Sequence, residues 1–319
     1  MTHMRRHLLG AALLLSLTPA WAADKPLVMG FSQVGAESEW RSANSNSIKD
    51  AAKAAGITLK FADAQQRQEN QVKAIRSFIA QRVDVIAFSP VVESGWDTVL
   101  REARNAKIPV ILTDRAVKVS DPSLYVTFIG SDFVEEGRKA GRWLLDWARK
   151  NAPQGDINVV ELQGTVGSAP ALDRKKGFEE VVKAEPRVQV IRSQSGDFTR
   201  AKGKEVMEAF LKAKDKKIHV LYAHNDDMAI GAIQAIEEAG LKPGKDITII
   251  SIDGVRGAFE AMVAGKLNVT VECNPMLGPQ LMQLAKDVVA GKPVPKRVTT
   301  EEGVFPAEVA ARELPKRKY

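Results

Sequence analysis

The feature of this sequence that most constrains its fold is a regular alternation between short hydrophobic runs and longer amphipathic segments. Strand-length runs such as LVMGFSQ, VIAFSP and INVVELQG are each followed by a stretch with helical periodicity. Such an alternation predicts parallel sheets with right-handed crossovers and helices on both faces. The expected helices span residues 38–55, 69–81, 96–106, 134–150, 171–184, 199–214, 227–240 and 277–290. Because the second half repeats the plan of the first, the sequence predicts an α/β protein with two doubly wound lobes.

Glycines mark the expected ends of several helices. Gly56, Gly240, Gly265 and Gly291 each follow an alanine at the end of an amphipathic segment. Glycine adopts the left-handed backbone that closes a helix without a steric penalty. We therefore expect helices to end at these positions.

Several hydrophobic runs end in polar residues, and this pattern indicates a binding cleft. The run IPVILTDR ends in Asp114 and Arg115, while other runs end in Asp63, Asn225 and Asp253. Charged side chains are costly to bury along a strand, whereas ligands of open α/β sheets bind at the carboxyl ends of the strands. We expect these polar strand ends to face a ligand.

The first residues predict export from the cytoplasm. Residues 1–22 combine a basic start, an apolar core over residues 8–17 and the small-x-small sequence Ala20-Trp21-Ala22, which is the pattern of a signal peptide. The apolar core is too short for a membrane anchor. We expect the mature protein in a bacterial periplasm or on the outer surface of a cell. A single cysteine, Cys273, excludes an intrachain disulfide.

Composition and motifs argue against several other functions. The formal net charge of +7 is spread among acidic residues, so we expect no nucleic-acid-binding patch. The GFSQVG segment lacks the pattern of a nucleotide-binding loop, and a G-x-S-x-G nucleophile motif is absent. His219 and His224 lie on one strand without nearby cysteines, which favours ordinary satisfied side chains over a metal site. We expect neither a cofactor nor a metal.

The remaining polar groups suit a neutral molecule that carries several hydroxyl groups. A hydroxyl group both donates and accepts, so an adjacent Asp and Arg can bind neighbouring hydroxyls without net charge. Trp40 and Phe198 are candidates to stack against the apolar face of a sugar ring. Either ring is equally suited to packing in a core.

Segments such as GFSQVGAESEWR, SQSGDFTR, AHNDDM and SIDG together resemble the periplasmic pentose- and hexose-binding proteins of ABC transporters. The resemblance covers nearly the whole mature chain. It implies a type I periplasmic-binding-protein fold, in which two Rossmann-like lobes joined by a three-segment hinge close over one sugar. The implied ligand is a monosaccharide, galactofuranose in the first place and another pentose or hexose as the alternative. The implied partner is an inner-membrane permease, with the binding protein as a monomer that performs no catalysis.

The resemblance also assigns the sugar contacts, residue by residue. The first lobe would supply Glu37, Trp40, Arg41, Asp114 and Arg115. The second lobe would supply Arg174, Phe198, Asn225, Asp253 and Glu272. Gln33 is a further candidate by its position alone.

The resemblance further implies where the lobes begin and end. The N-terminal lobe would contain residues 23–127 and 273–299, and the C-terminal lobe residues 128–272 and 300–319. The hinge would lie near residues 127–129, 272–274 and 298–300. Cys273 would then be a nearly buried thiol in the hinge.

Two rival classes could use a similar chain. A LacI-type regulator has the same two-lobed build, but it needs an N-terminal helix-turn-helix where this chain has its signal sequence. A sugar-processing enzyme could use Glu37, Asp114 or Asp253 as acid and base. These acids neighbour Arg or amide residues, which favours permanent ionisation over a raised pKa. We therefore expect binding without catalysis.

Overall fold

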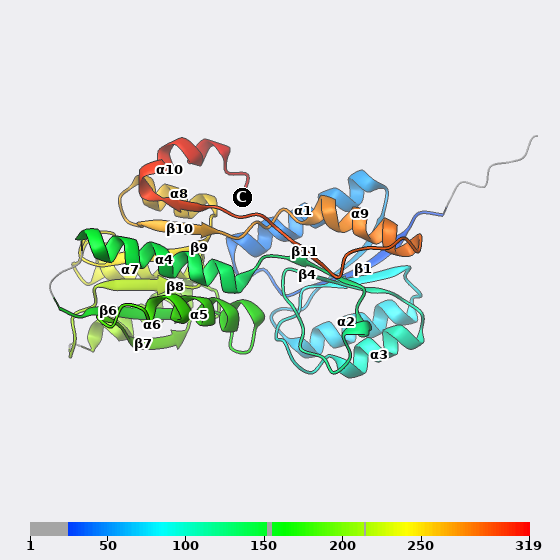
Figure 1. Ribbon diagram of the computed structural model, residues 1–319. Helices are drawn as coiled ribbons and strands as arrows, with labels where there is room; N and C mark the ends of the chain where they lie inside the picture. The colour runs from blue at the N-terminus through cyan, green and yellow to red at the C-terminus, as the bar shows by residue number, and fades with distance from the viewer. Residues whose placement is uncertain (1–24, 152–154, 214) are drawn as a thin grey trace, which may run out of the picture.

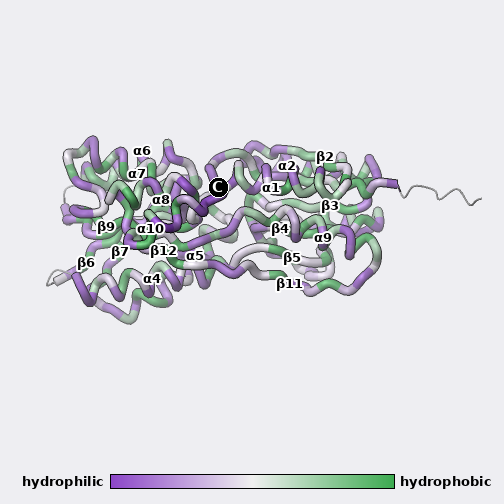
Figure 2. The backbone as a smooth tube through the Cα atoms, turned by 90° about the horizontal axis from the view of Figure 1, so that it is seen from above, coloured by the Kyte–Doolittle hydropathy of each residue, from purple (hydrophilic) through white to green (hydrophobic). Residues whose placement is uncertain are grey.

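The computed structural model describes residues 25–151, 155–213 and 215–319, so the expected signal peptide lies outside the described residues. Two lobes lie side by side along the length of the molecule, and the C-terminus lies close to their junction (Figure 1, Figure 2). Within the described part of the chain, no helix combines the length and the apolar character needed to cross a bilayer.

The first lobe is built on a six-stranded parallel sheet with the order β11-β5-β4-β3-β1-β2. Its strands are β1 (Val28–Gln33), β2 (Thr58–Asp63), β3 (Val85–Phe88), β4 (Val110–Thr113), β5 (Thr127–Gly130) and β11 (Arg297–Thr299). One face is covered by α1 (Glu39–Ala55) and α9 (Gly278–Val289), and the other by α2 (Gln68–Ala80) and α3 (Asp97–Asn105). Both faces of the sheet are therefore buried.

The second lobe repeats this plan with the strand order β12-β10-β9-β8-β6-β7, in which only the β10–β12 pair is antiparallel. Its strands are β6 (Ile157–Gln163), β7 (Val188–Ser195), β8 (Val220–Ala223), β9 (Thr248–Asp253), β10 (Val269–Glu272) and β12 (Val304–Pro306). Its helices are α4 (Phe133–Asn151), α5 (Ala169–Val182), α6 (Arg200–Lys212), α7 (Asp226–Glu238), α8 (Arg256–Val263) and α10 (Ala307–Glu313). The prediction of two doubly wound α/β lobes is confirmed.

Local sequence explains where the helices begin and end. The side chains of Ser38 and Asn225 cap α1 and α7 by accepting hydrogen bonds from backbone N–H groups three residues further on. Gly56 ends α1 with a φ of 69°, and the glycines expected at the other helix ends also adopt left-handed φ angles. Both capping residues lie at the junction between the lobes, which places the first turns of α1 and α7 there.

The chain passes between the two sheets three times. It leaves the first sheet after β5, returns to the first lobe between β10 and α9, and leaves it again between β11 and β12. The first passage was expected near residues 127–129, and the lobe boundary between residues 127 and 128 falls inside β5. Those residues belong to β5, in which Thr127 pairs with Ile111 of β4 and Ile129 pairs with Thr113. The first passage therefore follows Gly130.

The closest helix packing in the second lobe joins α4 to α5, and it depends on glycine. A methyl group added at Gly177 would lie 1.9 Å from the carbonyl oxygen of Val134. We expect Gly177→Ala to lower the free energy of unfolding by about 3 kcal/mol, because the backbones of the two helices would have to separate. Chemical denaturation monitored by circular dichroism measures this change.

Gly240→Ala is the matched control for this substitution. It meets no atom within 4 Å and tests only the left-handed backbone, where φ is 77°. We expect it to cost about 1 kcal/mol. A Gly177→Ala protein as stable as the unmodified protein would contradict the close packing of α4 on α5.

Candidate ligand-binding site between the lobes

A pocket lies between the two lobes, where the carboxyl ends of their strands face each other. It measures about 280 Å³ when space open to solvent is included, and it is lined by Glu37, Ser38, Trp40, Arg41, Asp114, Arg115, Pro170, Arg174, Phe198, Asn225, Asp253 and Cys273. The polar strand ends therefore line one space between the lobes, which is where ligands of open α/β sheets bind.

The first lobe contributes a buried, charge-balanced group of two arginines and two acids. Arg41 of α1 lies 2.7 Å from Asp114 Oδ2 and 3.0 Å from Glu37 Oε1. Arg115 donates a hydrogen bond to the carbonyl oxygen of Val91 at 3.1 Å and lies 3.9 Å from Glu37. Burial, together with the neighbouring Arg41, lowers the pKa of Arg115 to about 10, so Arg115 is still protonated at neutral pH.

Two atoms of this group have no hydrogen-bond partner within the described part of the protein. Glu37 Oε2 and Arg115 Nε are buried without a hydrogen bond to any other described residue. Buried polar atoms in proteins are almost always paired, so an unpaired acceptor and an unpaired donor in one pocket indicate a ligand that supplies both functions. A hydroxyl group has this dual character.

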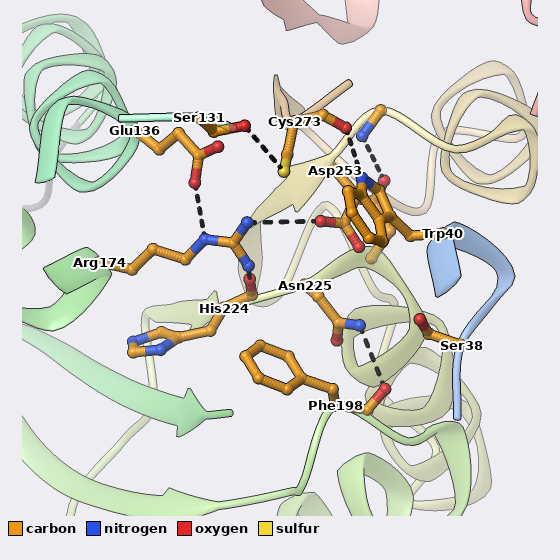
Figure 3. A network of polar contacts seen from close by, with 12 residues as sticks. Ser38, Trp40, Ser131, Glu136, Arg174, Phe198, His224, Asn225, Asp253 and Cys273 are labelled. Carbon is orange, nitrogen blue, oxygen red and sulfur yellow. Dashed lines mark hydrogen bonds and ion pairs between the residues drawn. The ribbon is translucent and has the colours of Figure 1, made fainter. Parts of the chain in front are cut away.

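The second lobe contributes a second arginine-centred group, shown in Figure 3. Arg174 of α5 donates from Nε to Glu136 Oε2 at 2.7 Å and from Nη1 to the carbonyl oxygen of His224 at 2.6 Å. Its Nη2 lies 3.6 Å from Asp253 Oδ1. Burial raises the pKa of Asp253 well above its ordinary value. The expectation that Asp253 would be permanently ionised and have no raised pKa is therefore wrong.

Two aromatic rings form the apolar walls of the pocket. Trp40 comes from α1, and its indole N–H donates to the carbonyl oxygen of Cys273 at 2.6 Å, across the lobe junction. Phe198 packs so closely on Gly164 that a methyl group there would lie 1.9 Å from the ring. The backbone carbonyl oxygen of Phe198 also accepts the side-chain amide of Asn225 at 3.1 Å. Both rings are therefore held in position by contacts within the protein.

Three of the pocket residues have a strained backbone. Asp114 and Phe198 have φ angles of 60° and 62°, and Asp253 has a φ of 133°. Such angles cost about 1 to 3 kcal/mol for residues other than glycine, and they persist where a functional geometry requires them. Of the eight described non-glycine residues with a positive φ angle, these three line the pocket.

The structure brings together nearly all of the side chains that sequence resemblance assigns to the site, and Glu272 is the exception. Its carboxylate turns away from the pocket, accepting from Arg317 Nη1 at 3.0 Å and from the Tyr319 hydroxyl at 3.2 Å. Contrary to the expectation, Glu272 therefore does not line the pocket, because residues of the C-terminal tail bind its carboxylate. The next residue, Cys273, lines the pocket instead, as do Ser38 and Pro170.

Other polar candidates lie outside the pocket. Asp63 ends the edge strand β2, where it is exposed, so its expected place in the cleft is wrong. Gln33 is buried behind the pocket, where its Oε1 accepts from Arg41 Nη1 at 3.1 Å and helps to position that side chain. His224 lies 3.0 Å from Glu161, and His219 Nδ1 accepts from the backbone of Asn158 at 3.0 Å. Both histidines thus have protein partners.

The acids Asp253 and Asp226 allow a functional carboxylate to be distinguished from a structural one. Burial raises the pKa of Asp253, so its ionisation at neutral pH opposes folding, and its φ of 133° adds strain. We expect Asp253→Gly to raise the free energy of unfolding by about 1 kcal/mol, because it removes both costs. Thermal and urea unfolding at pH 7 measure this change.

Asp226→Ala is the matched comparison. The Asp226 carboxylate accepts from the hydroxyls of Ser251 and Thr270 and from the backbone of Gly254 and Val255. We expect its loss to cost about 3 kcal/mol, because those buried donors would be left unpaired. An Asp253→Gly protein destabilised as strongly as Asp226→Ala would make Asp253 a structural residue.

Comparison with known proteins finds relatives that agree with one another in family. Residues 29–293 match the family described as periplasmic binding protein domain. The chain is 51% identical over 318 residues to the galactofuranose-binding protein YtfQ of Escherichia coli, covering 99% of both chains. A Mycobacterium smegmatis protein solved in complex with β-D-fucofuranose is 56% identical with a TM-score of 0.89, over 92% of this chain and 95% of that one.

A third relative is the binding component of the arabinose ABC transporter from Shewanella sp. ANA-3, solved with α- and β-L-arabinofuranose. It is 54% identical, with a TM-score of 0.87 over 91% of this chain and 95% of that one. Full-length similarity of this degree, together with the interlobe pocket, shows that the chain belongs to the periplasmic binding protein family.

Proposed function

We propose that this protein captures one furanose sugar, with galactofuranose as the principal ligand, and delivers it to an ABC permease. The observation that carries the proposal is the buried, charge-balanced set of arginines and acids that lines the pocket, in which Glu37 Oε2 and Arg115 Nε have no hydrogen-bond partner among the described residues. The set suits a neutral ligand, because Arg41 and Arg115 are matched by Asp114 and Glu37. The part of the pocket that the first lobe supplies therefore carries no excess of positive charge.

The arrangement of the pocket suits a single sugar ring. Trp40 and Phe198 offer flat apolar surfaces to the C–H faces of a ring, while the arginines and acids meet its hydroxyl groups. The three relatives described above are named for or solved with furanoses, and these three sugars differ mainly in the chain attached to the ring. In this proposal the protein therefore selects its sugar through contacts with the ring, and it accepts sugars that differ in the chain attached to the ring.

Selection of the ring form follows from the rigidity of the pocket. A furanose and a pyranose direct their hydroxyls differently, so a fixed pair such as Asp114 and Arg115 loses hydrogen bonds to the wrong ring. The lost bonds are not recovered from water in a buried site. Galactose in solution is mostly pyranose, so the protein would bind a minor form and its apparent affinity for galactose would be reduced by that fraction.

The lobes are in contact beyond the pocket, as in a closed state. The backbone N–H of Glu39 donates to Asp227 Oδ2 at 2.8 Å, and Arg200 Nη2 lies 2.9 Å from Glu39 Oε2. On another part of the junction, the backbone N–H of Glu93 donates to the carbonyl oxygen of Gly167 at 2.9 Å. A sugar that touches both lobes would shift the equilibrium towards this closed state.

The proposal also covers the cellular location of the protein and its oligomeric state. The signal sequence would direct the protein to the periplasm, where a monomer would shuttle between free sugar and the permease. The function needs no chemical change in the sugar. A binding protein of this kind contributes capture and release only, and the transporter supplies the energy.

Isotope-edited NMR of the protein with ¹³C-labelled galactose tests this function. We expect the bound sugar to show the carbon shifts of a five-membered ring and to remain chemically unchanged. Asp253→Gly is the control, because it should stay folded and yet bind at least about tenfold more weakly through the loss of hydrogen bonds to the sugar.

Two results would contradict the proposal at different levels. A bound six-membered ring would overturn the furanose assignment while leaving sugar binding intact. A protein that binds neither galactose nor L-arabinose, even at millimolar concentration, would overturn sugar binding itself.

A further inference from the structure

The three passages between the lobes meet at one set of hydrogen-bonded residues, which we call the passage cluster. Ser131 comes from the first passage. Cys273 and Asn274 come from the second passage, and Thr300 and Glu302 come from the third. These residues lie far apart in sequence, and none belongs to a helix or strand. Their contacts therefore join segments whose backbone angles must change when the lobes move.

One carboxylate oxygen is the centre of the passage cluster. Glu302 Oε1 accepts hydrogen bonds from the Ser131 hydroxyl, from the Thr300 hydroxyl at 2.8 Å and from the backbone N–H of Asn274 at 3.1 Å. These donors come from all three passages. Hydrogen bonds to an ionised acceptor are about twice as strong as those between neutral groups, so this oxygen is the strongest single link among the passages.

The passage cluster is also in contact with the pocket. Ser131 Oγ lies 3.3 Å from Cys273 Sγ (Figure 3), and Cys273 both lines the pocket and accepts the indole N–H of Trp40 at its carbonyl oxygen. The acceptor atoms of Glu136, Cys273 and Glu302 lie within 4.8 Å of one another, and Glu136 holds Arg174 in the pocket wall. A displacement of Glu302 would thus reach both Trp40 and Arg174.

The groups around the cluster favour hydrogen bonding over a cation. Glu136 is already paired with the guanidinium of Arg174 at 2.7 Å, and Lys139 Nζ donates to the carbonyl oxygen of Glu302 at 2.7 Å. The Glu302 oxygen has donors on three sides. A metal ion would have to displace these donors and lie beside two positive charges, which is electrostatically unfavourable.

We propose that Glu302 is a positioning residue that holds the three passages in the closed arrangement and thereby sets how long a bound sugar stays. This inference rests on the proposed function for its effect on the sugar. The bonds of Glu302 link passages that rotate relative to one another during opening, so they stabilise the closed state more than the open one. A weaker link speeds opening and sugar release, and leaves sugar capture by the open state nearly unchanged.

The test compares Glu302→Gln with Glu301→Gln, an exposed neighbour on the same passage. Stopped-flow tryptophan fluorescence with galactose gives the association and dissociation rates. We expect Glu302→Gln to raise the dissociation rate by about tenfold, because a neutral amide replaces a charged acceptor of three hydrogen bonds, with little change in the association rate. Glu301→Gln should match the unmodified protein.

A second readout needs no sugar. Cys273 is the only cysteine of the chain and is buried in the passage cluster, so its reaction with a thiol reagent reports opening of the cluster. We expect faster labelling in Glu302→Gln than in Glu301→Gln, and an intermediate rate in Thr300→Val, which removes one donor. Equal thermal midpoints in the variants would separate a change in opening from a loss of stability.

The outcomes separate the two proposals. Labelling and dissociation rates of Glu302→Gln equal to those of Glu301→Gln would overturn the role of Glu302. Should the unmodified protein fail to bind sugar, the proposed function would fall, while the labelling rates would still decide whether Glu302 holds the passages. Should Glu302→Gln not fold, Thr300→Val decides by the same two readouts.

Discussion

The pairing of buried arginines with carboxylates is the interaction on which the rest of the site depends. A buried charge is tolerated only when it has a partner and further hydrogen bonds, because water no longer solvates it. Arg41 meets this condition through Asp114 and Glu37, and Arg174 meets it through Glu136 and the carbonyl oxygen of His224. Each arginine is therefore held rigidly, at the point where the two lobes meet.

The fold supplies the one place where such pairs can lie next to a ligand. Parallel strands buried on both faces leave only their ends exposed, and the carboxyl ends of both sheets face the lobe junction. The strained backbones of Asp114, Phe198 and Asp253 then direct these residues into the pocket. Closure of the lobes brings the two arginine groups around one space, and the passage cluster holds the lobes in that position.

Local patterns in the sequence predicted the lobes and the polar strand ends that line the pocket, whereas Glu37, Arg41 and Arg174 were assigned only by resemblance to sugar-binding proteins. Hydrophobic periodicity identified the strands and helices, and polar strand ends such as Asp114 and Asp253 identified the pocket edge. The site predictions that failed depend on contacts between residues that are far apart in the sequence. Asp63 ends a strand like the others, but the strand order places it at the sheet edge. Glu272 lies next to the pocket residue Cys273 in the sequence. Its own carboxylate is bound by Arg317 of the C-terminal tail, which is distant in the sequence.

We infer that hydroxyl groups of a bound sugar form hydrogen bonds with two buried pocket atoms that have none within the described residues. A crystal structure of the protein with galactose tests it most directly, through the two buried atoms that have no partner among the described residues, Glu37 Oε2 and Arg115 Nε. The account predicts that ring hydroxyls lie within about 3.2 Å of both atoms. A sugar that leaves both atoms without a contact, or that binds outside the lobe junction, would contradict it.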